Sequence, residues 1–227
     1  MLRGGVTCFS DMYFYPEAAA QAVLAAGMRA AIGLIALDSP TAYATDADDY
    51  LSKGLAARDR YRQHELLSFC MAPHAPYTVS DQTFVRVRLL ADELDLPVHL
   101  HLHETAEEIR HSQTQHGRRP LARLNELGLA GNRVIAAHGV HLDEGEIGEL
   151  ARTGMSVAHC PTSNMKLASG MAPVTRMLDA GVNVGLGTDG AASNNRLDMF
   201  QEMRQAALLA KIQSGQAEAL PASHALW

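Results

Sequence analysis

The densest group of chemically capable side chains is a run of three histidines within one short apolar segment. His99, His101 and His103 alternate with apolar residues, which is the period of a β-strand. Side chains two positions apart on a strand point to the same face, so we expect the three imidazoles to share one face. Three buried imidazoles are costly unless they bind a metal or are hydrogen-bonded. Together with Glu104 at the end of the segment, the run predicts at least one metal ligand.

Three further polar residues each follow a separate apolar segment. Asp189 lies in the glycine-rich run Gly185–Gly190, where a carboxylate can approach a metal or a substrate closely, although an Asp in a turn or a helix cap has the same pattern. His138 ends an apolar run, and His74 lies in a loop that two prolines stiffen. Each of these histidines suits a metal or substrate contact, and each is equally compatible with a packed structural histidine.

Several familiar catalytic signatures are absent or misplaced. The run Gly185–Gly190 matches G-x-G-x-x-G, but a dinucleotide site needs a helix directly at the turn and a further strand with an acidic residue ~20 positions on. Residues 191–195 intervene and no further strand is expected, which disfavours a nicotinamide-dependent dehydrogenase. The H-E-x-x-H, G-x-S-x-G and P-C-x-x-C motifs of metalloproteases, serine hydrolases and cytidine-type deaminases do not occur.

Short apolar runs alternate with helical patterns along the chain, which predicts a parallel sheet covered by helices. The predicted strands are Gly5–Met12, Arg29–Ala36, Leu66–His74, Pro97–Glu104, Arg133–Val140, Ser156–Thr162 and Asn183–Gly190. The predicted helices are Pro16–Ala26, Asp46–Gln63, Asp81–Leu94, Ala106–His116, Pro120–Leu127, Glu144–Thr153, Pro173–Ala180 and Asp198–Gln213. Reactive residues at the ends of about six different strands favour a (β/α)₈ barrel, because an open doubly wound sheet gathers its ligands at one switch point.

Composition narrows the class of protein. The 227 residues are 47% hydrophobic and 19% charged, which is typical of one globular domain with its own core. A net charge of −6 offers no electrostatic footprint for a nucleic acid polymer. Cys8, Cys70 and Cys160 are far apart, which predicts reduced thiols and a cytoplasmic protein. No signal peptide or membrane span is expected, so we expect no membrane partner.

Four stretches together resemble the amidohydrolase superfamily, and most of all its 5-methylthioadenosine/S-adenosylhomocysteine deaminases and triazine-hydrolase relatives. They are His101-x-x-Glu104, the run I-A-A-H that ends at His138, the stretch C-P-T-S-N-M-K-L-A-S-G over 160–170, and G-T-D-G over 187–190. The S-N-M-K-L-A-S-G stretch and an H-A-P-Y-T loop at His74 are the most specific parts. The resemblance covers essentially the whole chain.

The resemblance implies a barrel with one divalent metal, usually zinc, with Fe²⁺ or Mn²⁺ as alternatives. His101 would be the metal ligand from the fifth strand and Asp189 the ligand from the eighth. Glu104 would move protons and contact the purine ring, while His138 would polarise the attacking water or the developing charge at the attacked carbon. Asp189 would also accept the proton of the water, and His74 would contact the ribose or the base.

The chain departs from this family pattern at both ends. The family's first strand, which carries two more ligands in His-x-His, has no counterpart, and the chain enters near Gly5 at what would be the second strand. We therefore expect one partial domain, 1–227, that lacks the first strand and the family's small β-domain. Catalytic zinc sites usually have three protein ligands, so we expect the chain alone to be inactive and the intact parent to be the enzyme. No metal role is carried over to His99, His103 or His159.

The implied substrate is a purine nucleoside such as 5′-methylthioadenosine, S-adenosylhomocysteine or adenosine, which would release ammonia. The loop 37–43 has no Arg or Lys to hold an amino-acid end, which favours methylthioadenosine or adenosine. A triazine chlorohydrolase, a guanine- or pterin-type deaminase and a non-catalytic barrel remain alternatives, because fold does not fix substrate. The resemblance leaves a homo-oligomer open.

Overall fold

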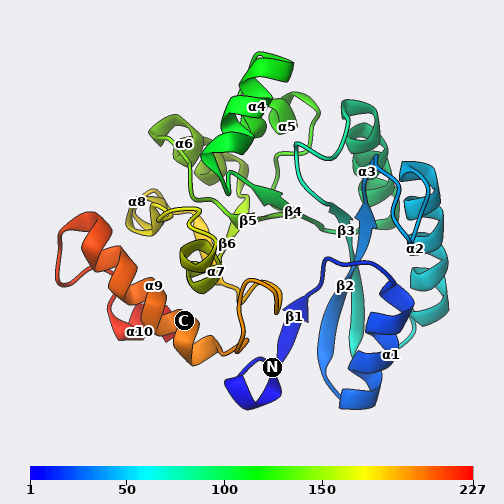
Figure 1. The fold of residues 1–227 in the computed structure, drawn as a ribbon, viewed down its shortest axis with the longest axis horizontal. Coiled ribbons are helices and arrows are strands. Elements are labelled where there is room, and N and C mark those ends of the chain that lie inside the picture. The colour runs from blue at the N-terminus through cyan, green and yellow to red at the C-terminus, as the bar shows by residue number, and fades with distance from the viewer. Residues whose placement is uncertain (227) are drawn as a thin grey trace. The chain divides into compact units, whose positions relative to one another are not determined.

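Within residues 1–226, which the computed structural model describes, seven parallel strands form a sheet in sequence order (Figure 1). Residue 227, the last of the expected domain, lies outside the described residues. The strands are β1 (Cys8–Ser10), β2 (Arg29–Ala36), β3 (Leu67–Pro73), β4 (Val98–Leu102), β5 (Val134–His138), β6 (Ser156–His159) and β7 (Asn183–Leu186). Sequence order is the arrangement expected of successive strands in a (β/α) barrel.

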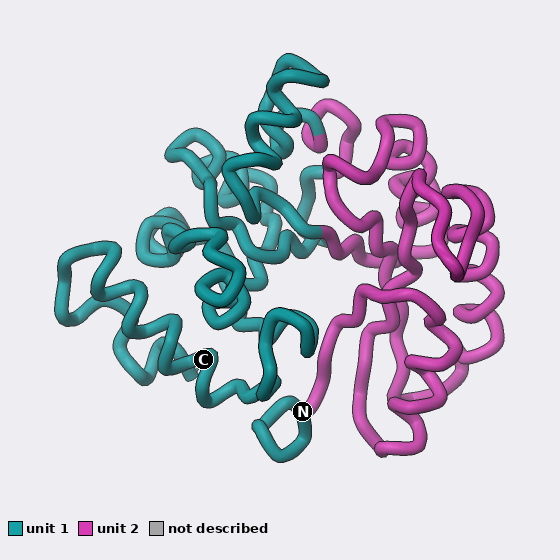
Figure 2. The backbone as a smooth tube through the Cα atoms, viewed as in Figure 1, with its two compact units in different colours: residues 1–6, 101–123, 130–227 teal, residues 7–100, 124–129 magenta. Residues whose placement is uncertain are grey.

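The chain divides into two compact units, coloured separately in Figure 2. Unit 1 comprises residues 1–6, 101–123 and 130–227, and unit 2 comprises residues 7–100 and 124–129. Strand β4 begins in unit 2 and ends in unit 1. The expectation of a single domain stays a prediction, and each unit is described by itself.

Unit 2 is built on β1, β2 and β3. Helices α1 (Pro16–Ala26) and α2 (Ala47–Tyr61) pack against β2, and α3 (Asp81–Leu94) packs against β3 (Figure 1). Strands β2 and β3 run in parallel register over seven residue pairs and are buried almost throughout. Near-continuous burial is what a parallel strand with both faces covered requires.

Unit 1 holds the end of β4, strands β5 to β7 and most of the remaining helices. These helices are α4 (Ala106–His116), α5 (Pro120–Glu126, whose last residues belong to unit 2), α6 (Glu144–Thr153), α7 (Pro161–Lys166), α8 (Val174–Asp179), α9 (Met199–Ser214) and α10 (Ala222–Leu226), preceded at the N-terminus by a short 3₁₀ helix, η1 (Leu2–Gly4). Helices α8 and α9 pack against β7, and α7 and α10 pack against α9. None of the helices within residues 1–226 has the length and apolarity to span a bilayer.

Most predicted elements agree with the structure. The strands are shorter than predicted at one or both ends except β2, helices α2, α5, α8 and α9 differ by one or two residues at their ends, and α7 and α10 were not predicted. Strand β2 and helices α1, α3, α4 and α6 have the predicted bounds. The segment predicted as a strand over Ser156–Thr162 is instead β6 followed directly by α7. Pro161 explains the change, because proline cannot donate to a strand ladder and is favoured at the first position of a helix.

A close backbone approach in unit 2 gives a test of the packing. A Cβ added at Gly33 would lie 2.2 Å from the backbone oxygen of Asp11 and 3.0 Å from Cβ of Ala72. Gly33→Ala should therefore lower the free energy of unfolding by about 1–3 kcal/mol or more, because the core must shift to admit the methyl group. Urea denaturation measures the effect.

Gly148→Ala is the matched control, because nothing lies within 4 Å of the added Cβ at this position in α6. This change should leave stability unchanged or raise it by about 0.5–1 kcal/mol. Equal effects of the two substitutions would contradict the close packing at Gly33.

Candidate active site

Three residues at strand ends in unit 1 have backbone conformations that side chains other than glycine rarely adopt. The φ angles are 56° at His103, 78° at His138 and 59° at Asp189. His103 follows β4, His138 ends β5, and Asp189 follows β7. Such conformations cost on the order of 1–3 kcal/mol each and persist only where surrounding contacts hold them. Two of these three residues, His138 and Asp189, are predicted site residues.

His138 brings three of the predicted site residues together. Its ring is buried and stacks on that of His101, with ring centroids 5.5 Å apart and an interplanar angle of 21°. Its Nε2 lies 3.7 Å from Oε2 of Glu104, and its Nδ1 lies 2.9 Å from Oδ1 of Asn164. An imidazole between an amide and a carboxylate is a suitable group to hold or move a proton.

Asp189, the fourth predicted residue, is held by donors on several sides. Its Oδ2 accepts hydrogen bonds from the hydroxyls of Ser163 at 2.5 Å and Ser193 at 2.7 Å, and its Oδ1 accepts the Gly190 N–H at 2.6 Å. Burial alone would raise the pKa of Asp189, but these hydrogen bonds and the charge of His138 outweigh it, so the pKa lies below its usual value. Asp189 is therefore a carboxylate at neutral pH, within electrostatic reach of His138.

The described residues do not complete a metal site by themselves. Among residues 1–226, no group of three or more His, Cys, Asp or Glu side chains is arranged to hold a metal ion. A catalytic zinc usually has three protein ligands, and the sequence analysis predicts two, His101 and Asp189. The role of these two residues as metal ligands therefore stays a prediction.

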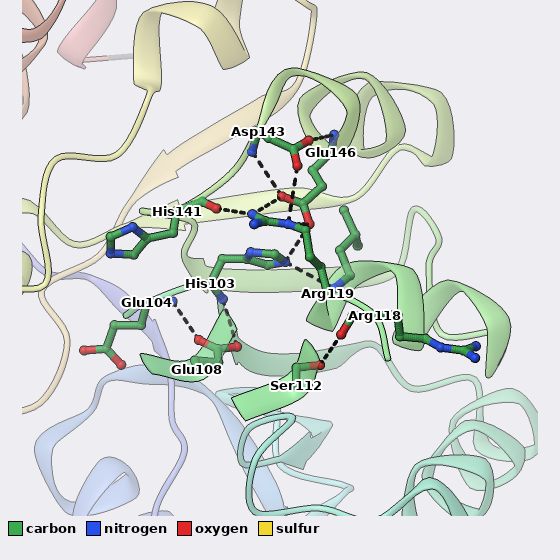
Figure 3. A network of polar contacts seen from close by, with 10 residues as sticks. His103, Glu104, Glu108, Ser112, Arg118, Arg119, His141, Asp143 and Glu146 are labelled. Carbon is green, nitrogen blue, oxygen red and sulfur yellow. Dashed lines mark hydrogen bonds and ion pairs between the residues drawn. The ribbon is translucent and has the colours of Figure 1, made fainter. Parts of the chain in front are cut away.

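The expectation that three histidines share one face does not hold for His103. Strand β4 ends at Leu102, and the positive φ of His103 turns the chain. The His103 ring accepts the backbone N–H of Leu121 at 3.1 Å and lies 3.2 Å from Oε1 of Glu146 (Figure 3). Burial, aided by the charge of Arg119, lowers the pKa of His103 to about 3, so the ring is neutral. It is a structural histidine, whereas His101 stacks on His138.

The other histidines singled out by the sequence have different surroundings. His99 lies in unit 2, with Nδ1 3.1 Å from the hydroxyl of Ser10. His74 also lies in unit 2, and its Nδ1 is 2.9 Å from the hydroxyl oxygen of Thr78. The substrate role of His74 stays a prediction. His159 ends β6 in unit 1, and burial, together with the charge of His138, lowers its pKa to about 4.

Glu108 is a supporting residue that the sequence analysis missed. Its carboxylate accepts the backbone N–H of His103 at 3.0 Å and that of Glu104 at 2.8 Å, and so fixes the backbone from which Glu104 projects (Figure 3). Burial raises the pKa of Glu108 to about 7, although the two N–H bonds act in the opposite direction. The T-x-x-E pattern of Thr105 and Glu108, a helix-capping signature, was the available signal.

The chain is similar in sequence to known proteins of one family. The sequence profile of the Amidohydrolase family matches residues 1–226. The chain belongs to this family. A 5-methylthioadenosine/S-adenosylhomocysteine deaminase of Teredinibacter turnerae is 50% identical over 226 residues, which are 100% of this chain and 51% of that protein. The chain thus spans about half the length of the curated relatives it matches.

Solved structures of the family confirm the predicted fold class. An adenosine deaminase from Xanthomonas campestris, crystallised with bound zinc, has a TM-score of 0.96 and 51% identity, over 99% of this chain and 51% of that chain. An atrazine chlorohydrolase from Arthrobacter aurescens has a TM-score of 0.91 and 25% identity, over 99% of this chain and 54% of that chain. The fold is that of a partial amidohydrolase barrel.

The environment of Glu108 predicts a pH dependence of stability. Its carboxyl keeps its proton in the folded chain up to about pH 7 but loses it near 4.5 when unfolded, so the folded state binds the extra proton between these values. The free energy of unfolding should therefore fall as pH rises from about 4.5 to 7, by up to about 3 kcal/mol. Chemical denaturation at a series of pH values measures this slope.

Glu108→Gln should flatten that part of the curve, even though its amide N–H₂ opposes a backbone N–H and lowers stability overall. Glu93→Gln, on the exposed surface of α3, should leave the slope unchanged. A slope that survives in Glu108→Gln would assign the titration to another group.

Proposed function

We propose that this chain supplies the proton-transfer groups of a hydrolytic deaminase acting on a purine nucleoside, with release of ammonia. The observation that carries the proposal is the grouping of His101, Glu104, His138 and Asp189 in unit 1, in a chain 50% identical to a methylthioadenosine/S-adenosylhomocysteine deaminase. One imidazole pair and two carboxyl groups are the residue types that hydrolysis of a ring amine needs.

Glu104 is assigned the transfer of a proton to a ring nitrogen of the substrate. Its Oε1 accepts a hydrogen bond from the hydroxyl of Ser169 at 3.3 Å, while Oε2 faces His138 and the backbone is fixed by Glu108. The Ser169 hydroxyl orients the Glu104 carboxyl, and Glu108 fixes the backbone that carries it. His138 polarises the attacking water, and ionised Asp189 accepts a proton from that water.

Zinc is proposed as the metal of the complete enzyme, with Fe²⁺ or Mn²⁺ as alternatives. The Xanthomonas campestris structure carries zinc, and His101 and Asp189 have the ligand chemistry that zinc accepts. Since the described residues form no group of three ligands, the proposal requires at least one ligand from outside this chain.

The substrate within the purine nucleosides is proposed to be methylthioadenosine or adenosine. The segment Leu37–Tyr43 carries no cation to pair with the amino-acid end of S-adenosylhomocysteine. Triazine or guanine-type chemistry is less well supported, because the atrazine chlorohydrolase is 25% identical to this chain against 50% for the nucleoside deaminase. Release of ammonia rather than chloride separates these activities. A cytoplasmic location and a homo-oligomer stay predictions.

Replacement of the proposed proton donor tests the activity. In the full-length protein, Glu104→Gln should lower kcat for deamination of methylthioadenosine by about 10²–10⁴, because the amide cannot deliver a proton. An ammonia-release assay measures the rate. Glu107→Gln, three residues away on the exposed face of α4, should stay within a small factor of the unchanged protein. Equal rates for the two variants would refute the role of Glu104.

The ligand count gives a second test on the chain itself. The purified 227-residue chain should hold less than one tightly bound zinc ion and should not release ammonia from purine nucleosides, because it offers two candidate ligands. Elemental analysis after dialysis and the same ammonia assay report both quantities. Stoichiometric zinc together with turnover would overturn the requirement for outside ligands.

A further inference from the structure

One short segment, Ser163–Ser169, contacts three of the proposed catalytic residues in turn. The Ser163 hydroxyl donates to Oδ2 of Asp189 at 2.5 Å, and the Ser169 hydroxyl donates to Oε1 of Glu104 at 3.3 Å. Between them, Oδ1 of Asn164 lies 2.9 Å from Nδ1 of His138. The segment comprises most of α7 and the turn after it, so a single local structure orients groups that come from three different strand ends.

The segment is itself held firmly. The backbone N–H of Asn164 bonds the carbonyl of Cys160 at 3.0 Å, and the N–H of Ser169 bonds the carbonyl of Asn164 at 2.8 Å. Lys166 donates to the carbonyl of Ala192 at 2.8 Å and to Oδ1 of Asn195 at 2.9 Å, which ties the segment to the loop that follows Asp189. Side chains on such a support keep their directions.

The contact between Asn164 and His138 has a chemical consequence that the other two contacts lack. An amide oxygen accepts a hydrogen bond, so Nδ1 of His138 must carry a hydrogen in order to donate to it. In the neutral ring, Nε2 then bears the lone pair and faces Oε2 of Glu104 at 3.7 Å. Which nitrogen carries the hydrogen decides whether His138 can accept a proton on the side of Glu104.

Packing alone does not explain the amide of Asn164. The residue is 1% exposed, and Nδ2 of its side chain has no hydrogen-bond partner among the described residues. An unpaired buried donor costs about 1–3 kcal/mol, which an apolar side chain of similar size would avoid. The hydrogen bond with His138 is the contact that the amide gains in return.

We infer that Asn164 is a positioning residue that selects the Nδ1–H tautomer of His138 and thereby presents the Nε2 lone pair to the site. The consequence for catalysis rests on the proposed deaminase function, but the tautomer itself does not. Asn164 acts through His138 and does not touch the substrate.

The tautomer can be measured in the chain as it exists. In ¹⁵N-histidine-labelled protein, two-bond ¹H–¹⁵N correlations distinguish the Nδ1–H from the Nε2–H form, and His138→Gln identifies the signal by its loss. The unchanged protein should show His138 as Nδ1–H. Asn164→Leu should convert it to Nε2–H, and Asn164→Asp should retain Nδ1–H because a carboxylate also accepts the bond.

Ser163→Ala is the matched control, one residue earlier in α7, and should leave the tautomer of His138 unchanged. An Nε2–H signal in the unchanged protein, or an Nδ1–H signal that persists in Asn164→Leu, would overturn the inference. If Asn164→Leu does not fold, Asn164→Asp decides: an Nε2–H signal there also overturns it.

The activity arm separates this inference from the proposed function. In the full-length protein, Asn164→Leu should lower kcat about 10–100-fold with little change in KM, and Asn164→Asp should recover part of the loss. Absence of deaminase activity in the unchanged protein would refute the proposed function but leave the tautomer result standing. An unchanged kcat in Asn164→Leu would refute the role of Asn164 as a positioning residue.

Discussion

Burial of polar groups at the strand ends of unit 1 is the constraint on which the candidate site depends. A buried imidazole or carboxylate is tolerated only if its polar atoms find partners, and the strained backbone at His138 and Asp189 adds a further cost. The partners come from one segment, α7 and its following turn, and from the loop after β7. Glu202 is a further buried carboxylate whose oxygens both find partners. It accepts a hydrogen bond from the backbone N–H of Thr162, the residue before Ser163, and another from the side-chain amide of Asn194.

Two carboxyl groups, one half-buried (Asp189) and one buried (Glu108), show how the hydrogen-bond donors within reach decide the charge. Asp189 receives two hydroxyl groups and a backbone N–H and lies near His138, so its pKa falls below the usual value despite burial. Glu108 accepts backbone N–H groups and lies near Glu104, and burial raises its pKa to about 7. The difference suits their positions, because Asp189 is proposed to accept a proton and Glu108 supports the backbone beneath Glu104.

The sequence predicted what depends on local patterns and missed what depends on distant pairing. Helices such as α1 and α6 were located to the residue, because apolar periodicity and capping residues are visible within a few positions. The predicted strand extended past Leu102 to include His103, because nothing in an alternating sequence shows where the hydrogen bonds to the neighbouring strand stop. Asn164 lies in the S-N-M-K-L-A-S-G stretch but was given no role, because its partner His138 lies 26 residues earlier and only the fold brings the two together.

The contacts that direct the candidate proton-transfer groups are local to unit 1. Each hydrogen bond that directs Glu104, His138 and Asp189 is made by groups of this chain, within unit 1. Metal ligation, in contrast, lacks a third ligand among the described residues. Proton transfer depends steeply on distance and direction, so its groups benefit most from a local, rigid support. Unit 1 therefore supplies the directional contacts that the proposed proton transfer needs, whereas the proposed metal site has only two candidate ligands among the described residues.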